Sequence, residues 1–140
     1  MKCLIDTNVI LDVLLKREPF CSSAAKVLKL SMYDKFSFYV SASAVTDIYY
    51  IANQTLRDRI QVKDLIVRLL QIVSIASVSE KEIKNALMLS WKDFEDSVQY
   101  SVALLQEVDG IITRNPKDYK ESKIKTWKPE EFLDTVVNDL

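Results

Sequence analysis

The stretch KCLIDTNVILD, residues 2–12, decides the fold. Apolar residues at positions 3–5 predict a short buried strand that ends at Asp6. From Val9 to Leu14 the apolar residues return at the spacing of one helix face. The chain therefore opens with a buried strand that passes directly into a helix, and a carboxylate stands at the junction.

The rest of the chain alternates strands with helices in the same way. Runs rich in β-branched and aromatic residues predict further strands, and apolar residues three and four apart predict the helices. Ser79 and Glu82 have the spacing of a capping box, and Pro129 suits the first turn of a last helix. We expect a single domain over residues 1–140, with a three-layer α/β/α sandwich around a mainly parallel sheet of four to five strands. The expected strands are 2–5, 36–40, 75–78, 110–113 and 123–127, and the expected helices include 22–33, 42–52, 59–73 and 96–107.

Composition narrows the class of protein. No apolar run approaches the roughly 20 residues of a membrane helix, and Asp6 interrupts the first apolar run before it resembles a signal peptide. Cys3 and Cys21 lack the spacing of metal ligands, so we expect a cytoplasmic protein with reduced thiols. The net charge of −1 gives no overall basic signal for nucleic acid. It does not exclude a nuclease, because a bound metal can supply local positive charge.

The chain contains no histidine. This excludes Ser–His and Cys–His catalytic triads and every zinc site that uses histidine. Catalysis would have to rest on carboxylates, lysine, tyrosine or a metal ion.

Several acidic and amide side chains follow predicted strands. In an open parallel sheet, sites form outside the carboxyl ends of the strands. Asp6 stands at the end of the first strand, and Asn115 and Asp118 follow strand 110–113. Asp96 stands at a helix start that should open on the same edge. The pattern predicts a cluster of oxygen donors there.

Asp47 supports this prediction independently. Its neighbours at helical spacing are Ala44, Ile48 and Ile51, which places a carboxylate on or beside an apolar helix face. A buried carboxylate is costly without a partner, and a cation is a good candidate. Oxygen ligands without histidine or cysteine suit Mg²⁺ or Mn²⁺. Such an ion can activate water and stabilise charge on a phosphodiester, so the aspartates point to a hydrolase of phosphate esters.

Each acidic residue also has an interpretation that needs no active site. Asp6 and Asp96 could cap the helices that follow them, and Asp47 could pair with a buried hydroxyl or an arginine. The remaining acids are expected to be a turn residue (Asp118), solvated loop or first-turn charges (Asp93 and Glu95) and a solvated helix position (Asp12).

Four segments carry a family resemblance. They are LIDTNVILD (4–12), SASAVTDIYY (41–50), DFEDSVQY (93–100) and ITRNPKDY (112–119). In this order they resemble the PIN-domain family and, within it, the VapC-like ribonuclease toxins of bacterial toxin–antitoxin pairs. The likeness covers nearly the whole chain.

The resemblance implies that Asp6, Asp47 and Asp96 are catalytic and bind Mg²⁺ or Mn²⁺. A fourth contribution comes from the last segment, where Asp118 and Asn115 both match family positions. The resemblance also implies supporting roles: Thr7 and Asn8 orient Asp6 or waters on the ion, Thr113 contacts the site through its hydroxyl, and Arg114 and Lys117 either contact phosphate or serve as exposed surface charges.

By the same resemblance, the function is metal-dependent endoribonuclease activity on RNA phosphodiester bonds, as the toxin of a toxin–antitoxin pair. The expected partners are RNA and a small antitoxin that lays a segment across the acidic cleft. A homodimer is also expected, with Tyr49–Tyr50 and residues 62–73 as candidate surfaces. One departure stands out: the second segment usually carries Glu, whereas this chain has the shorter Asp47.

Two other functions compete with this one. A PIN scaffold without activity would only bind a partner or RNA, and the Asp47 departure is compatible with it. A phosphoryl-transfer enzyme or receiver would use Asp6 as the nucleophile. A dehalogenase-like phosphatase, however, would need a second acid at position 8, which is Asn.

Overall fold

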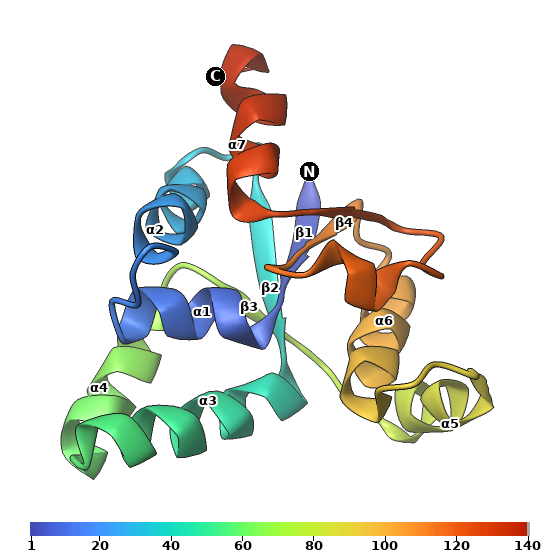
Figure 1. Cartoon of the computed structure of the whole chain (residues 1–140), viewed down its shortest axis with the longest axis horizontal. Helices are drawn as coiled ribbons and strands as arrows, with labels where there is room; N and C mark the ends of the chain where they lie inside the picture. The colour runs from blue at the N-terminus through green and yellow to red at the C-terminus, as the bar shows by residue number, and fades with distance from the viewer. Residues whose placement is uncertain (140) are drawn as a thin grey trace.

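A computed structural model describes residues 1–139, and its centre is a sheet of five parallel strands (Figure 1). The strands lie in the order β3-β2-β1-β4-β5, so β1 is central. The prediction of a mainly parallel sheet is confirmed. Their bounds are β1 Lys2–Ile5, β2 Ser37–Ser41, β3 Ser74–Ala76, β4 Gly110–Ile112 and β5 Lys125–Trp127.

Seven α-helices connect and cover the strands within residues 1–139. Helix α3 continues four residues beyond the predicted end at residue 52 and stops where Arg57 adopts a left-handed conformation (φ 51°). Helix α6 begins two residues before the predicted start because Asp93, rather than Asp96, is its N-cap. The helices are α1 Thr7–Leu14, α2 Cys21–Lys29, α3 Ala42–Leu56, α4 Arg59–Leu69, α5 Glu80–Met88, α6 Phe94–Gln106 and α7 Pro129–Val136, with 3₁₀ turns η1 Leu30–Met32, η2 Pro116–Tyr119 and η3 Val137–Asp139.

The sheet has a hydrophobic core on each face. Successive strand residues point to opposite faces, so Cys3 and Ile5 join one core while Leu4 joins the other. The first core is closed by α1, α2, α3, α4 and α7, and the second by α5 and α6. Figure 1 shows α1, α2 and α4 to the left of the strands and α5 and α6 to the right. The three-layer sandwich predicted from the sequence is confirmed.

Close packing against Trp127 explains why β4 contains a glycine, Gly110. A Cβ atom at Gly110 would lie 2.0 Å from Cζ3 of Trp127, which belongs to the neighbouring edge strand β5. The Trp127 ring also packs edge-on against Phe132 of α7, with ring centroids 5.2 Å apart. A side chain at position 110 would therefore displace the indole that joins β5 to the core.

The composition led us to expect reduced thiols and no membrane-spanning helix. Both cysteines are free thiols, and burial raises the pKa of Cys3 to about 12. Within residues 1–139, no helix has the length and apolar character needed to cross a membrane.

The strand order fixes where a site can form. From β1 the chain moves to β2 and β3 on one side, and it later returns to β4 and β5 on the other. Between β1 and β4 the connections leave in opposite directions, which opens a crevice at the carboxyl ends of these strands. The candidate site lies in this crevice.

Candidate active site

Three helix N-termini meet at the carboxyl edge of the sheet. Helices α1 and α3 follow β1 and β2 directly. Helix α6 precedes β4, and since it returns the chain across a parallel sheet it also begins at this edge. Asp6, Ser41 and Asp93 are the N-caps of α1, α3 and α6. The folding pattern therefore brings three distant sequence segments to one place, and the segment that follows β4 joins them there.

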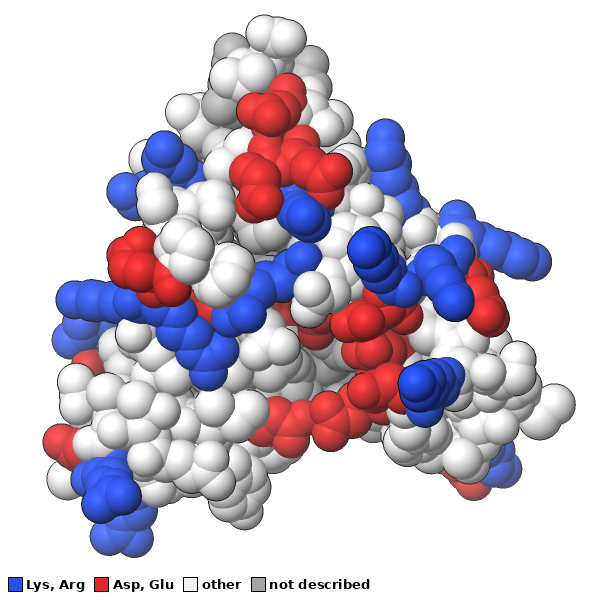
Figure 2. Space-filling view, in the orientation of Figure 1, with Lys and Arg blue, Asp and Glu red and all other residues white. Residues whose placement is uncertain are grey.

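A cavity of about 610 Å³ lies among these segments. Figure 2 shows carboxylates gathered in the hollow of this face, with basic side chains to its left and right. Of the residues predicted for the site, all line the cavity except Lys117, which is exposed on η2. Those that line it are Asp6, Thr7, Asn8, Asp47, Asp96, Thr113, Arg114, Asn115 and Asp118.

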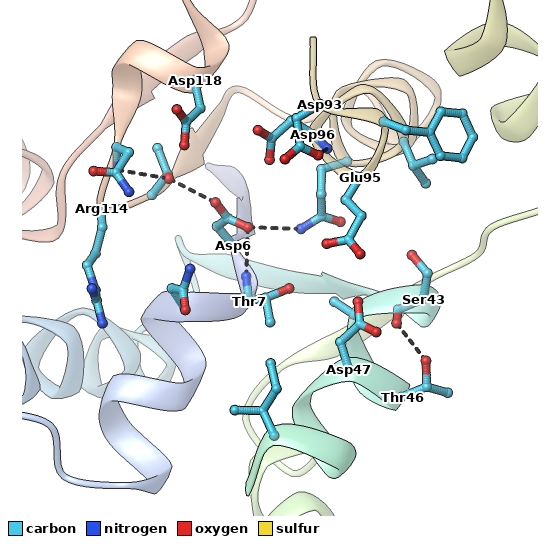
Figure 3. A pocket seen from close by; sticks show the side chains of 18 of the residues that line it. Asp6, Thr7, Ser43, Thr46, Asp47, Asp93, Glu95, Asp96, Arg114 and Asp118 are labelled. Carbon is cyan, nitrogen blue, oxygen red and sulfur yellow. Dashed lines mark hydrogen bonds between the residues drawn. The ribbon is translucent and has the colours of Figure 1, made fainter. Parts of the chain in front are cut away.

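Asp6 lies at the centre of the cavity (Figure 3). Its Oδ1 accepts hydrogen bonds from the Thr7 backbone N–H at 2.8 Å and from Nε2 of Gln99 at 3.3 Å. Its Oδ2 accepts the Thr113 hydroxyl at 2.9 Å. The Thr113 hydroxyl oxygen in turn accepts the Asn115 backbone N–H at 3.2 Å. Asp6 is therefore both the helix cap and a fixed carboxylate in the cavity, so the two interpretations of this residue are compatible.

The other carboxylates face Asp6 and repel one another. Burial, and then the charges of Asp93, Asp6 and Asp118, together raise the pKa of Asp96 to about 7. Across the cavity, the charge of Asp47 raises the pKa of Glu95, with burial as the second cause. Figure 3 shows Asp93, Glu95 and Asp96 on the α6 side and Asp47 opposite. A cation in the cavity would relieve this repulsion.

Two acidic residues contribute more than the sequence suggested. Asp93 and Glu95 were expected to be solvated charges, and both are exposed, yet both line the cavity and act on its electrostatics. Gln99 was not predicted at all. Its position three residues after Asp96 places it on the same helix face, which is the signal that could have identified it.

Asp12 was predicted to be solvated, and this is wrong. Asp12 is 1% exposed, and its carboxylate accepts hydrogen bonds from Nε and Nη2 of Arg114 at 2.7 and 2.5 Å. Arg17 lies nearby, with Nη1 3.7 Å from the Asp12 carboxylate. The sequence placed Asp12 on α1 but could not show that Arg114, 102 residues away, covers it.

Arg114 accordingly has a partner inside the protein. Its guanidinium is bound to Asp12 and lies over the Phe20 ring, 3.9 Å from the centroid. The ion pair with Asp12 also raises the pKa of Arg114. Arg114 lines the cavity as well, but its charge is used to hold α1 against the segment that follows β4.

The donor set suits a hard divalent ion. Within residues 1–139, no three carboxylate or thiol groups lie close enough together to bind one ion directly. Mg²⁺ nevertheless is usually bound by one or two carboxylates and keeps several of its waters. Asp6 and Asp96, with Asp47 and Asp118 further around the cavity, supply oxygen donors of this kind. The residues present therefore fit Mg²⁺ or Mn²⁺.

A match to a protein-family profile shows to which family this chain belongs. The profile of the PIN-domain family matches residues 2–117, most of the chain. The chain belongs to the PIN-domain family. The phosphoryl-transfer alternative for Asp6 loses its basis, since the PIN match covers the strand–helix junction on which it rested.

Solved structures support the fold of this PIN domain. A chain of VapBC2 from Rickettsia felis, bound to a promoter DNA fragment, aligns at TM-score 0.70 with 17% identity over 91% of this chain and 100% of the other. A toxin–antitoxin complex from Klebsiella pneumoniae gives TM-score 0.68, 19% identity and coverages of 91% and 97%. VapC20 of Mycobacterium tuberculosis, a sarcin–ricin loop cleaving toxin, gives 0.61, 14%, and coverages of 78% and 86%. No curated protein matches the sequence.

Proposed function

We propose that this PIN domain is a ribonuclease that depends on Mg²⁺ or Mn²⁺ and acts as the toxin of a toxin–antitoxin pair. The observation that carries the proposal is the cavity at the switch point of the sheet. There Asp6, Asp47, Asp96 and Asp118 come together from four separated segments, and the pKa of Asp96 is raised to about 7 by burial and by its acidic neighbours.

The roles of the residues follow from their positions. Asp6 and Asp96 would hold the ion, and Asp47 and Asp118 would complete the negative surroundings. Thr113 and the Thr7 backbone N–H hold the Asp6 carboxylate in one orientation. When bound, the ion supplies an activated water for in-line attack and neutralises charge on the phosphodiester. The shorter Asp47 side chain would act at longer range than a glutamate.

Two features support RNA as the substrate and a protein as the partner. The acidic cavity is open on a face where basic side chains lie on both sides of it, which suits a polyanion anchored around a cation (Figure 2). The structural neighbours include a toxin–antitoxin complex, and an antitoxin segment laid across the cavity would block it.

The two surfaces expected to form a homodimer contain exposed apolar side chains, Tyr50 on one and Val67 on the other. The homodimer and the cytoplasmic location remain predictions, and light scattering tests the first.

The test is cleavage of a fluorescent single-stranded RNA with Mg²⁺ or Mn²⁺. Parent protein, parent with EDTA, and Asp96→Asn are compared, and the folded state of the variant is checked by circular dichroism. Cleavage by the parent that is lost in both other arms supports the proposal. Full activity of folded Asp96→Asn would remove Asp96 from the site. A parent that binds RNA but cleaves none at any metal concentration favours the binding scaffold.

A further inference from the structure

The side chain of Gln99 makes one hydrogen bond in the cavity and leaves one buried atom without a partner. Gln99 is 6% exposed and lines the cavity. Its Nε2 donates to Oδ1 of Asp6 at 3.3 Å, whereas its Oε1 is fully buried and has no hydrogen-bond donor among the residues described. Buried polar atoms are nearly always satisfied in folded proteins, so this acceptor needs an explanation.

The orientation of the amide is set by Asp6. If Oε1 faced Asp6, two negatively polarised oxygens would meet and the carboxylate would lose a donor. The amide nitrogen therefore faces Asp6, and the oxygen is left to accept from something else in the cavity. The carboxylates cannot satisfy it when ionised, because they carry no proton to donate.

A second buried polar atom, the hydroxyl of Tyr119, lies close to the same acids. The hydroxyl of Tyr119, which is 2% exposed, makes no hydrogen bond of good geometry within residues 1–139, but it lies close enough to Asp6 for that carboxylate to act on it. Burial and the charges of Asp6 and Asp96 raise the pKa of Tyr119 well above its ordinary value, so the phenol stays neutral. Because Asp6 is within reach of the Tyr119 hydroxyl, the Gln99 oxygen is the buried acceptor here that the described residues leave without a donor.

We infer that Gln99 is a positioning residue of the site: its Nε2 orients Asp6, and its Oε1 accepts a hydrogen bond from a water that enters with the divalent cation. This inference rests on the proposed function. A hydrated cation brings donors only, since its waters point their protons outward, and this is what an unpaired amide oxygen requires. Mg²⁺ keeps several waters when proteins bind it, so such a donor is available. Partners of metal ligands in general orient the ligands and tune the affinity for the metal.

The experiment compares parent protein, Gln99→Met and Gln106→Met. Methionine has nearly the shape of glutamine but makes neither hydrogen bond. Gln106 is a matched control, because it lies on the same helix but not in the cavity wall. Mn²⁺ affinity is measured by calorimetry, and thermal unfolding is followed in EDTA and in saturating Mn²⁺.

We expect Gln99→Met to weaken Mn²⁺ binding by about 10-fold or more, the usual effect of losing a partner of a metal ligand. In EDTA its Tm should equal or exceed that of the parent, because the substitution removes a buried acceptor without a partner. The gain in Tm on adding Mn²⁺ should shrink. Gln106→Met should match the parent in both measurements.

Two results would overturn the inference while leaving the proposed function in place. One is Mn²⁺ affinity of Gln99→Met within twofold of a parent that binds Mn²⁺. The other is a fall of Tm in EDTA as large as the fall in Mn²⁺, which would make Gln99 a purely structural residue. A parent that binds no Mn²⁺ would overturn the proposed function and this inference together.

Discussion

The buried ion pair between Asp12 and Arg114 gives the sharpest stability prediction. Asp12 is 1% exposed and Arg114 24%, and two charge-assisted hydrogen bonds join them. Arg114→Met removes both bonds and the guanidinium that lies over Phe20, and it keeps a side chain of similar apolar length. The carboxylate that remains has lost its principal partner.

The magnitude follows from the burial. Removing one partner of a buried pair costs about 3–5 kcal/mol, because the other charge stays desolvated. Arg17, at 3.7 Å from Asp12, offsets part of this, so we expect a loss of about 3 kcal/mol in the free energy of unfolding. In a domain of this size that corresponds to about 10 °C in Tm. Asp12→Leu should cost less, about 1–2 kcal/mol, since the partly exposed Arg114 can reach water.

Urea unfolding measures the effect, and Arg68→Met is the matched control. Arg68 pairs with Asp64 at 2.9 Å on the surface of α4, where both side chains are more than half exposed. An exposed pair of this kind contributes under about 0.5 kcal/mol. The double variant Asp12→Leu/Arg114→Met should return to within about 1 kcal/mol of the parent. If Arg114→Met loses no more stability than Arg68→Met, the argument from burial is refuted.

Three further predictions concern packing, thiol reactivity and pH. Gly110→Ala should lower the free energy of unfolding by about 3 kcal/mol, because its Cβ would overlap the Trp127 ring; a loss under about 1 kcal/mol in urea would contradict this. In native protein, iodoacetamide should modify the partly exposed Cys21 and leave Cys3 intact until the protein unfolds, because burial raises the Cys3 pKa to about 12. Mass spectrometry of the labelled peptides measures this. Labelling of Cys3 in the native protein would argue against its burial. In EDTA, the raised pKa of Asp96 means that the folded state disfavours the ionised carboxylate, so the contribution of Asp96 to stability falls as pH rises from about 4 to about 7. The difference in free energy of unfolding between Asp96→Asn and the parent should therefore favour the variant by about 2 kcal/mol more at pH 8 than at pH 4. This value is smaller than the full pKa shift would give, because the site is partly solvated. Equal differences at both pH values would show that Asp96 has an ordinary pKa.

Much of the fold could be predicted because the signals are local. The apolar run before Asp6 and the helical spacing after it place β1 and α1, and the structure has both there. The capping box of Ser79 and Glu82 begins α5 as predicted. The ends of helices were less accurate: α3 and α6 both differ because a single backbone conformation or cap decides the end.

The residues of the candidate site also include some that local sequence patterns identify and one that they did not. Asp6, Asp47, Asp96 and Asp118 were found from their places after strands, on an apolar helix face and in recognisable segments, and all four line the cavity. Gln99 was missed: its spacing from Asp96 places it on the same helix face, but only the fold shows that its amide reaches Asp6, 93 residues away in the chain.

The sequence by itself determined the alternation of strands and helices, the absence of histidine chemistry and the aspartates that a parallel sheet would gather at one edge. Only the tertiary structure decided which charges are paired. It buried Asp12 against Arg114 and left Asp96 among other carboxylates. The physical reason is that secondary structure depends on residues a few positions apart, whereas the energy of a charge depends on whatever the fold brings within a few ångströms of it.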